Sequence, residues 1–334
     1  WFIKFLLVVL AFEVAAQFVQ FVLGEPPGDS LAGTFGLKGV GPFTMFVFFV
    51  VCVALGKWVA TGDWKTLVLT LALGAVASML NVTKFYLLAL VPLGLAALGL
   101  HMIRGGRFRQ LFVYVTLFLL AGAVLVPVYN RFIADTRGLA PLQEYIQPEN
   151  IENYLFNDGK GNVDGRYNLG RGLSLSYAWQ QIQRDGTTVL FGYGLGSRTS
   201  SAGLGIMGRT LREDIYGELG ESGLGTFIQE YGVVGLALFT LINLWIVVKL
   251  FLHARKTSDP MLAALEYGLI LFTLFWPMWL WYHRPWAAGV MMVLYWVSLG
   301  YAFRQIYPRR RAARPALSAP GVDPGPAPTT RRLP

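Results

Sequence analysis

Residues 190–203 of this 334-residue chain read LFGYGLGSRTSSAG and combine four glycines, an arginine and several hydroxyl side chains. Gly194 and Gly196 permit tight turns and a close approach of backbone N–H groups to a bound anion. Arg198 follows at once, and a guanidinium group pairs with phosphate through two parallel hydrogen bonds. The pattern is typical of an anion-binding turn, and equally of a turn-rich connector that binds nothing.

The composition of the chain indicates an integral membrane protein. Apolar residues make up 54% of it and charged residues only 14%, and the charges are gathered in short clusters. The net charge of +9 lies mainly in clusters beside apolar segments, without an aromatic-interleaved recognition module. We therefore expect contact with membrane lipids and no binding of nucleic acid. The single cysteine, Cys52, excludes a disulfide or a thiolate metal site within the chain and is expected in the core.

Hydropathy predicts a bundle of about eight transmembrane helices, since about 20 apolar residues cross a bilayer. The predicted spans are residues 1–23, 42–59, 66–80, 85–103, 111–129, 225–250, 261–281 and 286–303. The chain begins at Trp1 inside an apolar segment, so we expect a truncated N-terminus. Glu13 in the first span needs a partner, which we expect on the missing helices. Residues 304–334, rich in Pro, Ala and Arg, are predicted to form a disordered tail.

The basic clusters predict the orientation of these helices, because Lys and Arg are retained on the cytoplasmic side. If the spans alternate, three clusters fall on one face: Arg104 to Arg109, Arg255 with Lys256, and Arg309 to Arg311. The long loop 130–224 then lies on the extracytoplasmic face, between membrane regions 1–129 and 225–303. Within it, LSLSYAWQQIQ is typical of an amphipathic helix near the membrane surface. The predicted fold is all-α, with one large extracytoplasmic loop that contains short helices.

Three motifs follow one another in the second half of the chain: RGLSLSYAW from Arg171, LFGYGLGS from Leu190, and ESGLGTFIQEYGVVGLALF from Glu221. Their order and the layout of helices around one large loop resemble the O-antigen ligase and Wzy-type polysaccharide polymerase superfamily. The resemblance implies a GT-C-type glycosyltransferase in the bacterial inner membrane, with its site facing the periplasm. Such enzymes transfer a glycan from undecaprenyl pyrophosphate to an acceptor sugar with inversion, without a cofactor or metal. It further implies a chain-length regulator as a partner.

The resemblance also implies roles for several charged residues. Arg171 matches the loop arginine of the family, with Arg166 as the near alternative, and both are candidates for binding the pyrophosphate. Lys84 stands where members often carry an arginine at a helix start, but a snorkelling interfacial lysine would look the same. Arg198 is a further pyrophosphate candidate, and Glu230 is interpreted as a structural glutamate that orients an arginine.

The catalytic base departs from the ligases of that family, which carry a histidine shortly before this last motif. Glu221 and Ser222 occupy the equivalent position, and the long loop contains no histidine. This favours a polymerase, with O-antigen ligation as the alternative. Glu221 becomes the candidate base, since burial would raise its pKa, although it also suits a helix start. His283, at the extracytoplasmic turn between the last two spans, is the second candidate.

Two other classes of protein share the hydrophobic composition. A lipid or polysaccharide transporter would also carry many spans, but it should show repeated halves, and no internal repeat is visible. A noncatalytic scaffold would not need arginines and glutamates to converge on one face. The predicted function is therefore the one that the resemblance implies, a membrane-bound polysaccharide polymerase, with a ligase and a transporter as the alternatives.

Overall fold

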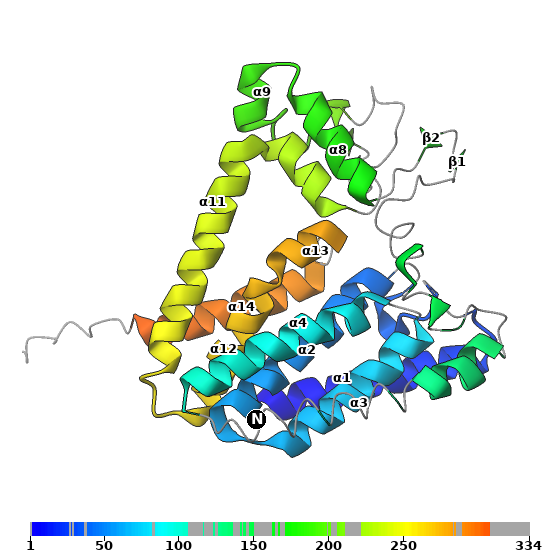
Figure 1. Cartoon of the computed structure of the whole chain (residues 1–334), viewed down its shortest axis with the longest axis vertical. Helices are drawn as coiled ribbons and strands as arrows, with labels where there is room; N and C mark the ends of the chain where they lie inside the picture. Colours follow the sequence, from blue (N-terminus) through cyan, green and yellow to red (C-terminus); the bar gives the residue numbers. More distant parts are fainter. Residues whose placement is uncertain are drawn as a thin grey trace, which may run out of the picture.

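The computed structural model describes most of the helical chain. The described residues are 2–26, 28, 30–36, 39–81, 84–105, 116, 123, 126–135, 141, 143–144, 147–149, 162–163, 166–167, 171–198, 200–201, 206–210, 222–282, 284 and 289–307. Within them the longer elements are all helices, which confirms the predicted all-α class (Figure 1).

The first half of the bundle contains α1 (Phe2–Val22), α2 (Val40–Thr61), α3 (Trp64–Leu80) and α4 (Lys84–Ile103). The second half contains α8 (Arg171–Ile182), α9 (Gly186–Phe191), α11 (Gly223–Ala254), α12 (Pro260–Leu274), α13 (Trp276–Tyr282) and α14 (Gly289–Ile306). The short elements are the 3-10 helix Gly33–Phe35, the π-helix Asn130–Ala134, and two antiparallel hairpins, β1 (Asn162–Val163) with β2 (Arg166–Tyr167) and β3 (Ser200–Ser201) with β4 (Ile206–Met207).

The apolar helices are those of a membrane protein. Three of them, α1, α2 and α11, are individually long and apolar enough to cross a bilayer, and the pair α12 and α13, bent by 45°, makes a fourth candidate. Helix α3 and residues 89–103 of α4 are shorter apolar helices. Seven of the eight predicted spans coincide with described helices, whereas most of 111–129, like the tail from residue 308, lies outside the described residues.

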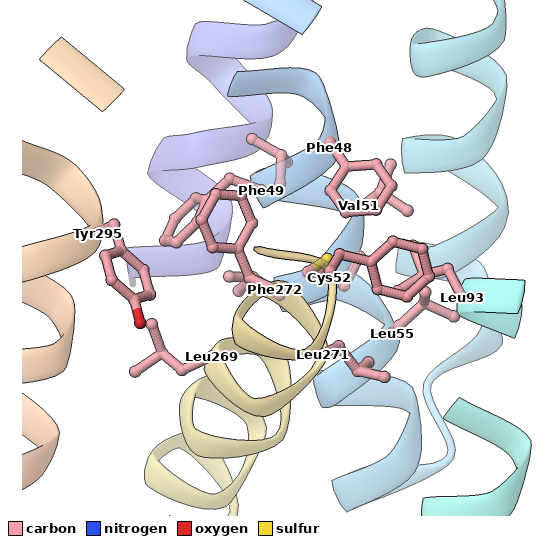
Figure 2. Packing of buried hydrophobic residues seen from close by; sticks show 14 of the residues in the cluster. Phe48, Phe49, Val51, Cys52, Leu55, Leu93, Leu269, Leu271, Phe272 and Tyr295 are labelled. Atoms are coloured by element: carbon pink, nitrogen blue, oxygen red, sulfur yellow. The ribbon is translucent and has the colours of Figure 1, made fainter. Parts of the chain in front are cut away.

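Helix α2 is the centre of the bundle, since 89% of its most apolar window is buried. It packs closely on α12, where a Cβ added at Gly268 would lie 2.7 Å from Val53 Cα. Small residues at such a crossing let two helix backbones touch, which is a common way for membrane helices to associate. Figure 2 shows Phe48 and Phe49 of α2 against Phe272 of α12, with the Phe49 and Phe272 rings edge-to-face at 5.3 Å. Cys52 lies buried in this core, as predicted.

The polar face of α1 has a different partner from the one predicted. Glu13 accepts the backbone N–H of Thr34 at 2.8 Å and also the Thr34 hydroxyl. One turn further on, Gln17 Nε2 donates to the Leu31 carbonyl at 2.6 Å. The partner of Glu13 is therefore the segment that follows α1 in the same chain. Because a buried carboxylate is costly without hydrogen bonds, this segment has to fold back along α1.

Asp63 caps the N-terminus of α3 and links it to α2. Its carboxylate accepts the Thr66 N–H at 3.2 Å and lies 2.6 Å from Lys57 Nζ. The hydrogen bond from Lys57, followed by that from the Thr66 hydroxyl, lowers the pKa of Asp63 well below its usual range. A lowered folded-state pKa means that ionisation of Asp63 stabilises the fold above the unfolded-state pKa of about 4. That contribution is lost as the pH falls further.

Replacing Asp63 with alanine is expected to lower the free energy of unfolding by about 1 kcal/mol at pH 7, because the N-cap and the ion pair are both lost. Unfolding of the purified protein in mixed detergent micelles measures this. Asp63→Asn keeps a capping oxygen and should lose less. The difference between wild type and Asp63→Asn should shrink below about pH 4, and a constant difference would contradict the assigned pKa shift.

Helix α11 is bent, and the bend separates two regions of the molecule. Gly232 has φ +65° and ψ −166°, which is not helical, so residues 223–231 and 233–254 run in different directions. We call α8, α9 and residues 192–198 and 223–231 the cap layer. In Figure 1 it lies at one end of the bundle, beyond α13. The predicted span 225–250 thus begins within the cap layer.

Candidate functional site

The glycine-rich segment docks on the bend of α11. In a straight helix the carbonyls of Gln229 and Glu230 would accept from residues 233 and 234. Here they accept the N–H groups of Tyr193 at 2.7 Å and of Gly194 at 3.1 Å. Those two N–H groups are directed to the helix, so the structure favours the connector interpretation for this part of the segment.

Two glycines make this docking possible. Gly192 has φ +70°, and a Cβ added to it would lie 2.5 Å from the carbonyl carbon of Glu230. On the opposite side, a Cβ on Gly232 would lie 2.6 Å from Gly192 N. Both obstacles are backbone atoms that cannot move aside. Gly194 and Gly196 also have positive φ values, of 95° and 78°, and form the turns that lead to Arg198.

Arg198 is buried, with only 2% of its surface exposed, and α11 holds it in place. Its backbone N–H donates to Glu230 Oε1 at 2.9 Å, while Nε donates to Gln229 Oε1 at 2.5 Å. Nη1 donates to the Thr210 carbonyl at 3.3 Å. The Glu230 carboxylate thus accepts from the main chain of Arg198 and not from its guanidinium group. The guanidinium group donates to the side chain of Gln229, a residue that the sequence motifs did not single out.

Arg171 begins α8 and connects the cap layer to the bundle. Its Nε donates to the Tyr282 carbonyl at 3.2 Å, and its guanidinium lies 4.5 Å from the centre of the Tyr282 ring. Such a cation above an aromatic face is attracted by the ring quadrupole. Tyr282 is the last residue of α13, so a cation stands where the cap layer meets the end of an apolar helix.

Packing between α8 and α11 fixes the position of Arg171. A Cβ on Gly225 would lie 3.2 Å from the Ser174 carbonyl oxygen, so the two helices touch through small residues. They run side by side in the same direction, which brings their N-terminal ends together (Figure 1). Ser222 stands at the N-cap position of α11 at that end, without a capping hydrogen bond to its side chain. Its hydroxyl is buried and makes no hydrogen bond to the described residues.

The described side chains do not include all the predicted site residues. Glu221 and His283 lie outside the described residues. Lys84 begins α4 and Arg166 lies in β2, but the description does not extend to their side chains. The structure thus brings Arg198 together with Glu230, Gly194 and Gly196 at the bend. It places Arg171 at a second point, on Tyr282.

Tyr282 and Arg284 are site candidates that sequence reasoning missed. Both belong to WYHRPW, where aromatic and basic residues mark the end of a predicted span. Arg284 is partly buried and lies two residues beyond the one that Arg171 contacts. The aromatic and basic residues of this turn are the sequence signal that identifies both candidates.

The arrangement suits an anionic group attached to a lipid. A guanidinium fork matches phosphate geometry. Arg171 has the apolar helix α13 on one side, where a lipid chain would lie, and the cap layer on the other. Among the described residues, no group of three or more His, Cys, Asp or Glu could hold a metal ion. No protein-family model matches this sequence, and a comparison with curated proteins finds no match either.

Proposed function

We propose that this protein is a membrane glycosyltransferase that polymerises oligosaccharide repeat units carried on undecaprenyl pyrophosphate. In this proposal the chain crosses the bacterial inner membrane with about eight helices, and the cap layer faces the periplasm. The motif order from Arg171 to Phe239 and the basic clusters at the other helix ends support this arrangement. The active site lies between the cap layer and the bundle.

One observation carries the proposal: Arg171 of the cap layer donates a hydrogen bond to the main-chain carbonyl of Tyr282, the last residue of an apolar helix. A lipid-linked glycan needs an apolar surface for its isoprenoid, cations for its pyrophosphate and a polar region for its sugars. The junction between the cap layer and the apolar helices offers all three within the length of one lipid-linked glycan. Arg171 is therefore assigned to the pyrophosphate. Lys84 at the start of α4, Arg166 in β2 and Arg284 just beyond α13 are proposed as further cations.

The proposed reaction requires the protein to stabilise negative charge on the leaving pyrophosphate and to remove a proton from the acceptor hydroxyl. As the bond between the anomeric carbon and the phosphate oxygen breaks, negative charge grows on the pyrophosphate, and Arg171 stabilises it. The acceptor hydroxyl attacks from the opposite face, which inverts the anomeric centre, and Glu221 removes its proton. Arg198 acts as a positioning residue in this scheme, since it is buried against Gln229. His283 is the second candidate for the base.

Purified protein in lipid nanodiscs, supplied with an undecaprenyl-pyrophosphate-linked oligosaccharide, is expected to produce a ladder of lengthened glycans. Each coupling should release one undecaprenyl pyrophosphate, measured by mass spectrometry. Glu221→Gln, which keeps the size of the side chain but cannot take a proton, should give no ladder. Transfer only to a separately added acceptor would identify a ligase instead. Translocation of unchanged substrate across vesicles, without release of the carrier, would indicate a transporter.

A further inference from the structure

Four large apolar residues of the cap layer are exposed beside the bend of α11. They are Leu190 and Phe191 at the end of α9 and Tyr193 and Leu195 in the glycine-rich segment, with 47%, 59%, 38% and 79% of their surfaces exposed. We call them the apolar rim. Exposed apolar residues are ordinary on a membrane-spanning helix, but the rim belongs to a helix of six residues and a loop.

The rim is held rigidly and is not a loose end of chain. The N–H of Tyr193 donates to the Gln229 carbonyl at 2.7 Å, and the next N–H donates to Glu230. The Tyr193 hydroxyl donates to the Gln181 carbonyl of α8 at 2.8 Å, which ties the same residue to a second helix. The cap layer therefore presents these side chains in a fixed direction.

The rim continues an apolar surface that α11 already presents. The carbonyl carbon of Leu190 lies so close to Gly232 that an added Cβ would be 2.5 Å away, so the rim begins where the long segment of α11 begins. Along that segment the exposed large residues are apolar, and the exposed Thr240 donates its hydroxyl to the Leu236 carbonyl within the helix. These apolar residues are Val233, Leu238, Leu241, Ile242, Leu244, Trp245, Val248 and Leu252. Figure 1 shows α9 beside this end of α11 and away from α14.

We propose that the apolar rim inserts into the lipid leaflet at the end of α11, so that the membrane itself supports the cap layer. The occupant is lipid because the rim is continuous with the exposed face of a helix that is long and apolar enough to span the bilayer. Leucine and phenylalanine then reach the acyl boundary, while Tyr193 lies at headgroup level with its hydroxyl bonded to protein. This inference does not depend on the proposed glycosyltransferase activity.

The lone cysteine makes a direct test possible. In a Cys52→Ala background, a single cysteine at Leu195 carries a spin label, and the full protein is reconstituted in lipid nanodiscs. Collisions with oxygen, which concentrates in lipid, are compared with collisions with a water-soluble nickel chelate. The label at Leu195 should favour oxygen over nickel, although less strongly than one at Leu241 in the middle of α11, because oxygen is most concentrated at the centre of the bilayer. A label at Ser258, in the exposed link between α11 and α12, should favour nickel.

A label at Phe191 provides a second position in case Leu195→Cys folds poorly, and it should give the same oxygen preference. Nickel accessibility like that of Ser258 at both positions would overturn the proposal, because the rim would then face water. A label that neither reagent reaches would also overturn it, since the rim would then be covered by protein.

Discussion

Replacing Gly232 with alanine should straighten or strain α11 and release the glycine-rich segment from it. At φ +65° a residue with a side chain is strained, which costs about 1–3 kcal/mol. The new Cβ would also lie 2.6 Å from Gly192 N, a backbone atom that cannot rotate away. We expect the hydrogen bonds from Tyr193 and Gly194 to α11 to break, because the segment must retreat.

Hydrogen exchange measures this loss residue by residue. In the wild-type protein the amides of Tyr193 and Gly194 are hydrogen-bonded and should exchange slowly. In Gly232→Ala they should exchange about 5- to 150-fold faster, as a loss of about 1–3 kcal/mol implies. Gly300→Ala in α14 is the matched control, since a Cβ there meets nothing within 4 Å. It should leave these amides unchanged. Equal protection in Gly232→Ala would mean that the bend does not depend on glycine.

Hydropathy predicted the helices well because a bilayer requires long apolar runs. The ends of the predicted segments 42–59 and 66–80 differ by at most two residues from those of α2 and α3. Hydropathy could not predict the direction in which a helix continues, because a bend changes backbone dihedral angles and not the apolar character of the side chains. The bend at Gly232 depends on one pair of dihedral angles. The break between α12 and α13 is easier to predict from the sequence, because Pro277 in WPMW has no N–H to continue the hydrogen bonds of the preceding helix.

The candidate site was likewise predictable only in part from the sequence. The motifs single out Arg198 and Glu230 as separate candidates, and the hydrogen bond between them becomes visible only in the structure. Sequence could not show that the Glu230 carboxylate takes the main-chain N–H while Gln229 takes the guanidinium, because that depends on how α11 is rotated. The contact of Arg171 with Tyr282 joins residues 111 positions apart and becomes visible only when α8 is placed over α13.

Replacing Arg171 with alanine should have the largest effect on the proposed reaction. If its guanidinium stabilises charge on the departing pyrophosphate, its loss should lower kcat by about 100- to 1000-fold, as the loss of one such donor does in other enzymes. Arg171→Lys keeps the charge but not the fork and should retain intermediate activity. Release of undecaprenyl pyrophosphate by the reconstituted protein, followed over a range of substrate concentrations, separates kcat from KM.

Tyr282 supplies the control that distinguishes binding of substrate from support of the cap layer. Arg171 donates to the main-chain carbonyl of Tyr282 and stacks on its ring, so Tyr282→Phe preserves both contacts and should retain nearly full activity. Tyr282→Ala keeps only the carbonyl. If Arg171 merely fastens the two layers, Arg171→Ala and Tyr282→Ala should impair activity alike and raise amide exchange throughout α8. If Arg171 binds pyrophosphate, Arg171→Ala should lose far more activity than Tyr282→Ala while exchange in α8 stays near that of the wild type.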